Sequence, residues 1–289
     1  MAGLKGTGIN PKKFHSSQIK FYIALAPIIV FMVLPMLYIF FTAFKPMDEL
    51  FIYPPRFTTA RPTLENFTIL FHVAGDVLVS RYLFNSILST ILVVFATILI
   101  SASAGYILSK KRFKGKKFIF QVNTLALMFV PVAVTIPRYL IIVQIGLIDS
   151  FLAHILPLLA MPVGLFLVKQ FIDQIPDSLV EAAQIDGATD YFILFKIIIP
   201  LIIPALSTVA ILAFQLSWNA TEASKLFIND EALKTFAFFM NALISTTGNT
   251  VAGKGISAAA SLLMLLPNLV LFIILQSRVM NTMVHSGIK

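Results

Sequence analysis

Six long apolar stretches run along the chain, and shorter polar segments separate them. A helix needs about 20 mostly apolar residues to cross the hydrocarbon core of a bilayer. Because each stretch reaches or approaches this length, we predict six transmembrane helices in an all-α, polytopic membrane protein. The predicted helices cover residues 21–44, 83–108, 118–137, 152–168, 192–216 and 257–276.

Prolines mark the irregular points of this pattern. The fourth stretch is the shortest and contains Pro157, Pro162 and Gly164, which weaken it as a continuous helix. In the fifth stretch, Pro200 and Pro204 each remove a backbone donor, so we predict a kink or a broken start there. The first stretch is too long for the apolar region of a signal peptide, and no small-residue cleavage site follows it, which indicates an uncleaved anchor.

Composition strengthens the membrane assignment. Hydrophobic residues make up 58% of the chain and charged residues 12%, whereas roughly a quarter of the residues in soluble domains are charged. Mean hydropathy is +0.91. The formal net charge of +9 lies in loops, without a charged domain to present it, so we predict no nucleic-acid partner. The chain has no cysteine and its four histidines are scattered, which excludes disulfides and predicts no metal site.

Lysine and arginine in the loops predict the orientation, because loops rich in these residues stay in the cytoplasm. With both ends of the chain inside, fourteen of the 22 basic residues are cytoplasmic and eight are external, and six of the fourteen lie in the short loop 109–117. We therefore predict a cytoplasmic N-terminal segment, residues 1–20, and then a single six-helix domain, residues 21–289, with a cytoplasmic C-terminus. The polar segment of about 173–190 then lies in the cytoplasm.

The predicted helices contain few reactive groups. Leaving tyrosine aside, His154 and Lys196 are the only ionisable residues in the six ranges, and each lies near a helix end. Intramembrane charges usually mark ion paths or proton relays. A proton-coupled carrier is therefore disfavoured, whereas a sodium site built from carbonyls and hydroxyls remains open. No paired carboxylates and no Ser-His-Asp set occur at membrane depth, so we predict that the chain is not an enzyme.

One stretch has part of the spacing of a phosphate-binding loop. Gly248, Gly253 and Lys254 fit the pattern G-x4-G-K-[ST], but Gly255 replaces the magnesium-binding hydroxyl. The stretch is also predicted to be external, away from cytoplasmic ATP. We interpret the match as chance and predict no cofactor in this chain, so that energy for uphill transport must come from another chain.

The cytoplasmic segment contains strong local signals for a short helix. Ser178 and Glu181 have the S-x-x-E spacing of a capping box, which starts a helix by binding its free amide groups. Asp186 and Gly187 end the helix, since glycine readily adopts the left-handed conformation that closes one. Asp190 can cap the helix that follows. The pattern predicts a two-turn helix outside the bilayer, which taken alone is a well-capped connector.

Small side chains on this helix would let another surface approach its backbone closely. They belong to a run with the spacing E-A-A-x3-G-x9-I-x-L-P, in which isoleucine replaces the leucine: Glu181, Ala182, Ala183, Gly187, Ile197, Ile199 and Pro200. This run resembles the signature loop of binding-protein-dependent ABC importer permeases. The longer stretch IPDSLVEAAQIDGAT, residues 175–189, is similar to the carbohydrate-uptake branch of that family, in particular to the smaller maltose-type permease.

Other parts of the chain resemble the same branch. They are residues 54–67, 85–88, 104–117, 130–150 and 217–219. Arg138 is unusual in the fourth of these stretches. After Asn219 the chain departs from the acidic and aromatic run that is common in the family, which leaves the role of that loop open.

The resemblance implies a function for the cytoplasmic helix. In such permeases it is a coupling helix, which docks into an ATP-hydrolysing subunit and transmits the closure of the ATPase dimer. The residues that this role assigns here are Ser178, Glu181, Ala182, Ala183, Asp186, Gly187 and Pro200. The implied partners are a second homologous permease, two ATP-binding subunits that carry ATP and magnesium, an extracellular solute-binding protein, the lipid bilayer and an oligosaccharide substrate.

A pathway for neutral, hydroxyl-rich sugars needs amide and hydroxyl groups rather than fixed charges. The candidates are Asn85, Ser86, Ser89, Asn123, Gln215, Asn219 and Asn268. Each of them could instead join neighbouring helices by hydrogen bonds. The glycine-rich stretch 245–255 is interpreted as a flexible external loop, which either reaches towards the binding protein or is simply exposed.

Two other functions stay open on the sequence alone. A permease of the same superfamily for another solute, such as glycerol phosphate, would want more cationic residues along its path. An ion-coupled secondary carrier belongs to a different class, and both the spans without deep charges and the coupling-helix motif disfavour it.

Overall fold

The computed structural model describes the backbone of residues 19–72, 77–248 and 250–286, and the side chains of these residues up to Gln276. Within these ranges the regular structure is helical and no strand occurs. Most of the predicted N-terminal segment 1–20 lies outside the described residues, as do Lys5, Lys12, Lys13 and Lys289 from the charge count.

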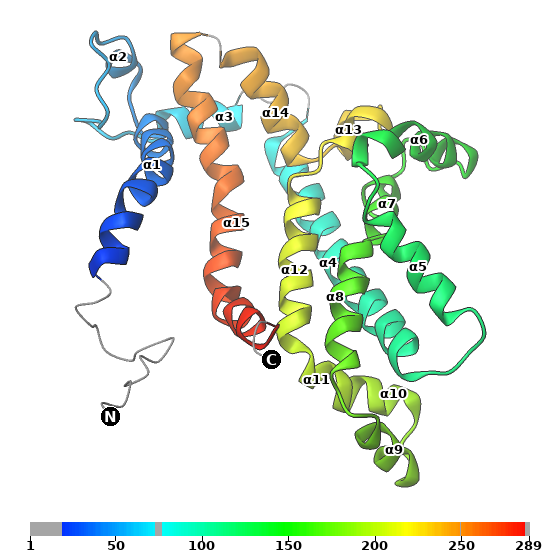
Figure 1. Cartoon of the computed structure of the whole chain (residues 1–289). Coiled ribbons are helices and arrows are strands. Elements are labelled where there is room, and N and C mark those ends of the chain that lie inside the picture. The colour runs from blue at the N-terminus through cyan, green and yellow to red at the C-terminus, as the bar shows by residue number, and fades with distance from the viewer. Residues whose placement is uncertain (1–18, 73–76, 249, 287–289) are drawn as a thin grey trace, which may run out of the picture.

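Four helices are long and apolar enough to cross a membrane, and they confirm the first, second, fifth and sixth predicted spans (Figure 1). They are α1 (Ile19–Ala43), α4 (Val79–Lys110), the run Ile203–Leu226, which begins with α12 (Ile203–Trp218), and the part Val251–Gln276 of α15 (Val251–Ser286). In α1 the side chains between Phe21 and Phe40 are largely exposed. A helix that is apolar on all sides is typical of a membrane span.

The third and fourth predicted spans are bent pairs of helices, and counting each pair as one span brings the total to six. The pair that forms the third span is α5 (Lys116–Ala126) followed by η2 (Pro131–Val134) and α6 (Thr135–Gln144), with a bend of 111° between the two parts. The prediction of one continuous helix over 118–137 is therefore wrong. Val130 is extended, at φ −74° and ψ 131°, because a residue that precedes proline avoids the helical region.

Prolines also divide the pair of helices that forms the fourth span. It consists of η3 (Phe151–His154) and α7 (Leu156–Leu159), followed by α8 (Pro162–Asp173), with a bend of 43°. The fifth span begins in pieces, as Pro200 and Pro204 predicted. These are α10 (Asp190–Phe192), a wide π-type turn η4 (Ile193–Ile198) and α11 (Ile199–Leu201), after which α12 starts at Ile203.

The prediction of a flexible loop over 245–255 is wrong. Helix α14 (Phe236–Thr247) ends within this stretch, and α15 begins at Val251. A methyl group on Gly255 would collide with the Asn66 side chain, so glycine allows α15 to lie against α3 (Glu65–His72). The glycines of this stretch therefore serve close packing. The remaining short helices are α2 (Met47–Leu50), α9 (Asp177–Ile185), α13 (Glu222–Leu226) and η5 (Glu231–Leu233).

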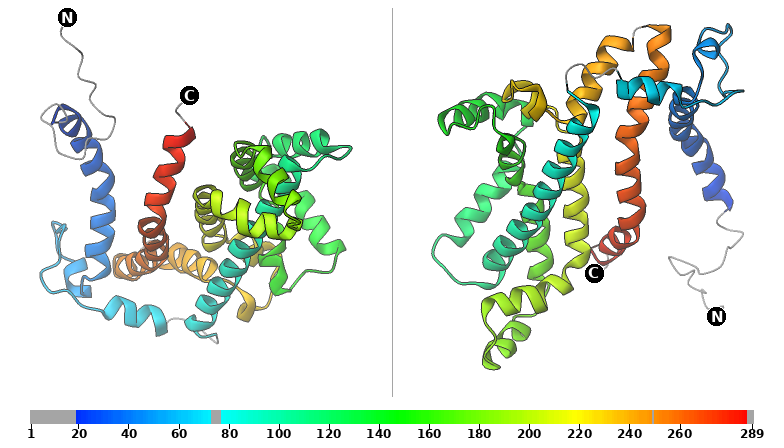
Figure 2. Two further views of the ribbon diagram at one scale, coloured as in Figure 1. Left: turned by 90° about the horizontal axis from the view of Figure 1, so that it is seen from below. Right: turned by 180° about the vertical axis from the view of Figure 1, so that it is seen from behind.

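Helix α4 is central to the bundle, with α8 and α12 packed against it (Figure 2). Glycines bring α4 and α8 together, as small residues do between membrane helices. A methyl group on Gly105 would lie 2.9 Å from Val168 Cγ1, and one on Gly164 would lie 3.0 Å from Ser101 Oγ. The core cluster around Val168 also contains Val180 of α9, so one face of α9 packs against this core.

Candidate functional site

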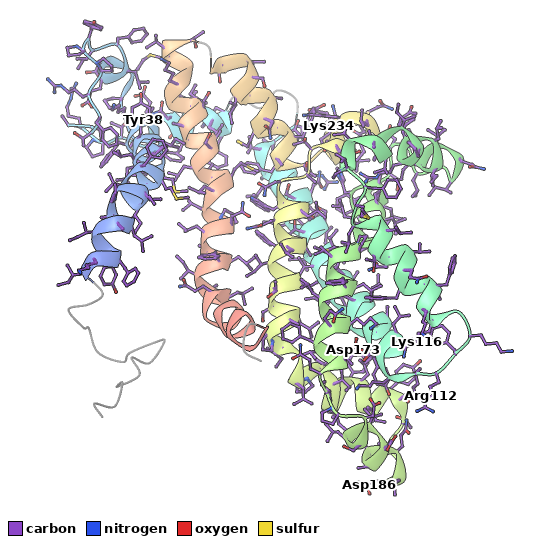
Figure 3. All side chains as sticks on the ribbon, in the orientation of Figure 1. Tyr38, Arg112, Lys116, Asp173, Asp186 and Lys234 are labelled. Atoms are coloured by element: carbon purple, nitrogen blue, oxygen red, sulfur yellow. The ribbon has the colours of Figure 1, made fainter. Side chains whose placement is uncertain are left out.

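Two places in the molecule carry the candidate functional groups, and they lie at opposite ends of α12 (Figure 1). One is the α9 loop, which we define as residues 173–190. The other is a polar pocket between α6, α7, α12 and α13. Figure 3 shows Arg112, Lys116, Asp173 and Asp186 at the α9 end and Lys234 at the other.

Helix α9 begins one residue before the predicted capping box. Pro176 occupies the cap position, without a side-chain hydrogen bond, and Asp177 and Ser178 are already helical. The capping-box prediction for Ser178 and Glu181 is therefore wrong, because a proline in the cap position moves the start of the helix forward. The Asp177 carboxylate in the first turn favours the helix electrostatically, since it lies near the positive end of the helix dipole.

The end of α9 is as predicted. Asp186 is the C-cap residue after Ile185, and Gly187 follows with φ +81°. A methyl group on Gly187 would meet no atom within 4 Å. Glycine is thus required for its left-handed backbone and not for space.

The two faces of α9 differ in their contacts. Val180 is buried, and Ala183 packs partly buried against the same core. On the other face Glu181 and Ala182 are exposed, and Ile185 is 86% exposed. Within the described residues, the side chains of Ser178 and Glu181 have no hydrogen-bond partner. This outer face is small, partly apolar and free to receive another surface.

Two lysines at the C-terminal end of α4 bind the two ends of the α9 loop. The Lys110 side chain is 4% exposed, and its Nζ lies 2.6 Å from Asp177 Oδ1. It also donates to the backbone oxygen of Ile175. Lys111 Nζ lies 2.5 Å from Asp190 Oδ1. These cations lower the pKa of the carboxyl groups of Asp177 and Asp190 from the ordinary aspartate value, in both cases chiefly by hydrogen bonding.

The prediction that Asp190 caps the next helix is wrong. Thr189 is the cap, and its Oγ1 accepts a hydrogen bond from the Phe192 amide at 3.3 Å. The Asp190 carboxylate instead accepts from Lys111 and, at 3.2 Å, from the Tyr106 hydroxyl. It joins the α9 loop to α4, while Pro200 lies exposed in the first turn of α11.

Three predicted pathway residues are buried on α4, and two of them, Asn85 and Ser86, bind the backbone of the segment after α13. Asn85 Nδ2 donates to the carbonyl oxygens of Ala232 and Lys234, each at 2.9 Å. Ser86 Oγ accepts from the Phe236 amide at 2.9 Å, and Ser89 Oγ donates to the Ser86 carbonyl at 3.2 Å. In this structure these groups join the chain to itself.

Asn123 and Asn268 lie away from those residues and from each other. Asn123 Nδ2 donates to the Pro162 carbonyl at 3.1 Å, which connects α5 to α8. Asn268 Nδ2 donates to the Met264 carbonyl of its own helix at 3.1 Å, while its Oδ1 is buried and has no partner within the described part of the chain.

The structure brings Gln215 and Asn219 together in the polar pocket, a cavity of about 280 Å³. The other lining residues are Arg138, Ala153, His154, Pro157, Leu158, Leu216, Ala220, Glu222, Ala223 and Phe227. His154 is 4% exposed, and its Nε2 lies 3.0 Å from the Leu233 carbonyl oxygen.

Sequence reasoning missed the charged part of this pocket. Arg138 Nη1 lies 2.7 Å from Glu222 Oε2. An arginine inside an otherwise apolar stretch is the signal that could have identified it, since such residues usually have a functional partner. Glu222 gave no comparable signal, because it lies in a polar loop 84 residues away.

Known proteins resemble this chain over most of its length. Residues 98–277 match the family of binding-protein-dependent transport system inner membrane components. The chain is 30% identical over 284 residues to the probable ABC transporter permease protein YurM of Bacillus subtilis, which covers 96% of this chain and 91% of that protein. It is 30% identical over 263 residues to the arabinooligosaccharides transport system permease protein AraQ of Halalkalibacterium halodurans. This match covers 89% of this chain and 91% of AraQ.

A solved structure has the same fold. It is a crystal structure of a bacterial ABC transporter involved in the import of the acidic polysaccharide alginate. The TM-score is 0.76 at 21% sequence identity, and the match covers 92% of this chain and 99% of that one.

Proposed function

The chain belongs to the family of binding-protein-dependent transport system inner membrane components, and from this premise we propose that it is one permease subunit of an ATP-driven importer of sugars or oligosaccharides. It is a multi-pass membrane protein and a transport subunit, not an enzyme. Its transport system depends on a solute-binding protein. The proposal adds the substrate class, the energy source and the remaining subunits.

The observation that carries the proposal is the outer face of α9. Glu181, Ala182 and Ile185 are exposed on a helix whose opposite face is packed, in a loop whose two ends are bound by Lys110 and Lys111. Such a helix can transmit a push to α4 and α12, because Val180 packs into a core that both of these helices share. We infer that it docks into an ATP-hydrolysing subunit through the residues Ser178, Glu181, Ala182, Ala183, Asp186, Gly187 and Pro200.

The assembly that fits this role contains a second, homologous permease and two ATP-binding subunits. ATP and magnesium would bind to the ATP-binding subunits, so this chain would supply no cofactor site. The α9 loop, and with it both termini, would face the cytoplasm, while the polar pocket would lie near the external side. The basic loop 109–117 supports this orientation, because it lies at the α9 end of the molecule.

A sugar substrate is supported by the relatives and by the polar pocket. AraQ of Halalkalibacterium halodurans is named for arabinooligosaccharides, and a trehalose transport system permease protein, SugB of Mycobacterium tuberculosis, is 29% identical over 266 residues. The amide groups of Gln215 and Asn219 line the pocket. Amides both donate and accept hydrogen bonds, which suits the hydroxyl groups of a sugar.

Orientation can be tested with single cysteines, because the chain has none of its own. Ser178 is exposed at the α9 end, and Tyr53 is 93% exposed at the opposite end. In intact cells an impermeant thiol reagent should label Tyr53→Cys and spare Ser178→Cys, and permeabilised cells should label both. Labelling of Ser178→Cys alone in intact cells would reverse the proposed orientation.

The substrate class is tested by uptake into vesicles that contain the complete transporter. We expect ATP-dependent uptake of at least one labelled oligosaccharide from a panel of neutral and acidic sugars, and none of glycerol phosphate. Glycerol phosphate uptake without sugar uptake would replace the sugar assignment while leaving the ATP-driven mechanism in place.

A further inference from the structure

Arg138 and Glu222 form an ion pair inside the polar pocket, although the pocket sits among apolar helices. The side chain of Arg138 is 27% exposed and that of Glu222 is 37% exposed, and their N···O distance is 2.7 Å. Removing two charges partly from water costs about as much free energy as their attraction returns, so such a pair is weak support for stability. A binding role is the better explanation for its position.

One oxygen of this pair is unsatisfied. Glu222 Oε2 accepts from Arg138, whereas Glu222 Oε1 is buried and has no hydrogen-bond partner among the residues that the structure describes. A buried carboxylate oxygen without a donor is unfavourable, and native proteins rarely leave one. Glu222 lines the pocket, so a turn of its carboxylate towards the cavity would bring this unpaired acceptor to a ligand hydroxyl.

The pocket offers donors as well. An arginine has five N–H donors, and the structure uses one of Arg138's, for Glu222. Asn219 Nδ2 donates to the Gln215 carbonyl at 2.8 Å, which leaves Asn219 Oδ1 as an acceptor. The pocket lining therefore contains both donors and acceptors, which matches groups that both donate and accept, as hydroxyls do.

Charge selects among the possible ligands. Arg138 and Glu222 together carry no net charge, so the pair gives no attraction for an ion. An anionic sugar would meet the free oxygen of Glu222 and would have to displace this carboxylate from Arg138. A cation would meet Arg138 in the same way. A neutral polyol satisfies both partners without breaking the pair.

The volume and the lining of the cavity agree with one sugar unit. The cavity of about 280 Å³ is at the lower end of the roughly 300–1,000 Å³ of small-molecule sites. Ala153, Pro157 and Leu158 form an apolar wall of the cavity, which can contact the C–H face of a sugar ring.

We propose that the polar pocket is a subsite for one neutral sugar unit, in which Arg138 and Glu222 bind its hydroxyl groups and discriminate against acidic sugars. This inference rests on the proposed sugar transport. It adds the charge class of the substrate and the residues that determine it, and it differs from the acidic cargo of the transporter whose fold this chain shares.

The test is uptake by the complete transporter in vesicles, with labelled maltotriose and arabinotriose as neutral probes and trigalacturonate as the acidic probe. The variants are Arg138→Gln, Glu222→Gln and the double variant. The control is Lys234→Gln, because Lys234 forms a similar ion pair, 2.6 Å from Glu231, outside the pocket. KM and maximal rate are measured for each, together with the unfolding midpoint in detergent.

We expect both single variants to raise KM for the neutral probe by roughly tenfold to a hundredfold, the factor that a charge-assisted hydrogen bond contributes. The double variant should stay impaired although its amides can still bond to each other. Glu222→Gln should raise the ratio of acidic to neutral uptake, because it leaves Arg138 unpaired. Lys234→Gln should leave KM unchanged.

Other outcomes would overturn the assignment. If the double variant regains normal uptake, the pair only joins α6 to α13. Preference of the unaltered transporter for trigalacturonate, or equal losses for neutral and acidic probes in Glu222→Gln, would remove the subsite and leave ATP-driven sugar uptake standing. Lack of ATP-driven uptake of every sugar would reject the sugar-importer proposal itself, and the subsite with it.

Discussion

The α9 loop and the polar pocket are assembled in opposite ways. Every group on the outer face of α9 comes from one short run of the chain, between Ser178 and Ile185. The pocket instead joins Arg138 to Glu222, which are 84 residues apart, and adds Gln215 from α12. A contiguous site leaves a spacing in the sequence, whereas a site made by packing leaves separate polar residues that look like many others.

The two regions also differ in where their unsatisfied groups point. On α9 the side chains of Ser178 and Glu181 are exposed to solvent, so their free hydrogen-bonding capacity is not unfavourable. The pocket residue Glu222 has a buried Oε1, so leaving the hydrogen-bonding capacity of this oxygen unused is unfavourable. The first arrangement suits a protein surface that docks reversibly, and the second suits a small ligand that enters and leaves.

The largest effect on stability is expected for a substitution of Asn85. This substitution tests whether Asn85 supports the fold or binds substrate as the pocket residues do. Asn85→Ala removes the donor of the Lys234 carbonyl and leaves the Ala232 carbonyl with Arg81 Nε alone, at 3.2 Å. We expect the unfolding free energy to fall by about 1–3 kcal/mol, with KM unchanged in the transporter that folds. Gln215→Ala is the matched variant and should change KM without loss of stability. An increased KM in Asn85→Ala at unchanged stability would return Asn85 to the pathway.

Gly187→Val should have the next largest effect and tests the α9 loop. A left-handed backbone costs about 1–2 kcal/mol in a residue with a side chain, which corresponds to a loss of about tenfold in correctly formed loop. Gly187→Asn is the control, because asparagine tolerates this conformation. We expect both chains to insert into the membrane, with uptake reduced at least several-fold more in the valine variant. Equal uptake in the two would show that the turn has no part in coupling.

The smallest effect concerns the two ion pairs that hold the α9 loop. The side chains of Asp177 and Asp190 are 75% and 55% exposed, so each pair contributes at most about 1 kcal/mol. Their pKa values are lowered in the folded state. This contribution is therefore present above the unfolded value of about 3.9 and is lost as pH falls through the lower folded pKa.

The measurement is the unfolding midpoint in detergent between about pH 6 and pH 3. The unaltered protein should lie slightly above the double variant Asp177→Asn, Asp190→Asn at pH 6, and the difference should shrink as the pH falls below about 3.9. A difference that grows as the pH falls would mean that these carboxyl groups do not stabilise the loop as anions.

Sequence reasoning worked where one physical signal acts locally. Pro200 and Pro204 predicted the broken start of the fifth span, and Gly187 predicted the turn after α9, because each constrains its own backbone. It failed where a neighbour changed the outcome. Pro176 takes the cap position from Ser178, and Asp190 binds Lys111 and Tyr106 instead of capping.

Packing explains the remaining differences between the sequence pattern and the structure. Gly253 and Gly255 suggested a flexible loop, but they lie in α15, where Gly255 gives room for Asn66. Asn85 and Gln215 both suggested a sugar pathway, yet one is buried against backbone and the other lines a cavity. Such differences depend on which helices become neighbours, and periodicity along one helix does not contain that information.

The central claim is that work reaches this chain from an ATPase through the α9 loop, and the energy source of uptake tests it most directly. Vesicles would contain this chain, its partner permease, the ATP-binding subunits and the binding protein. We expect uptake to require ATP on the ATPase side, to stop when the ATPase cannot hydrolyse it, and to persist when proton and sodium gradients are dissipated. Accumulation of solute by this chain without the ATPase, under an imposed ion gradient, would contradict the account and identify a secondary carrier.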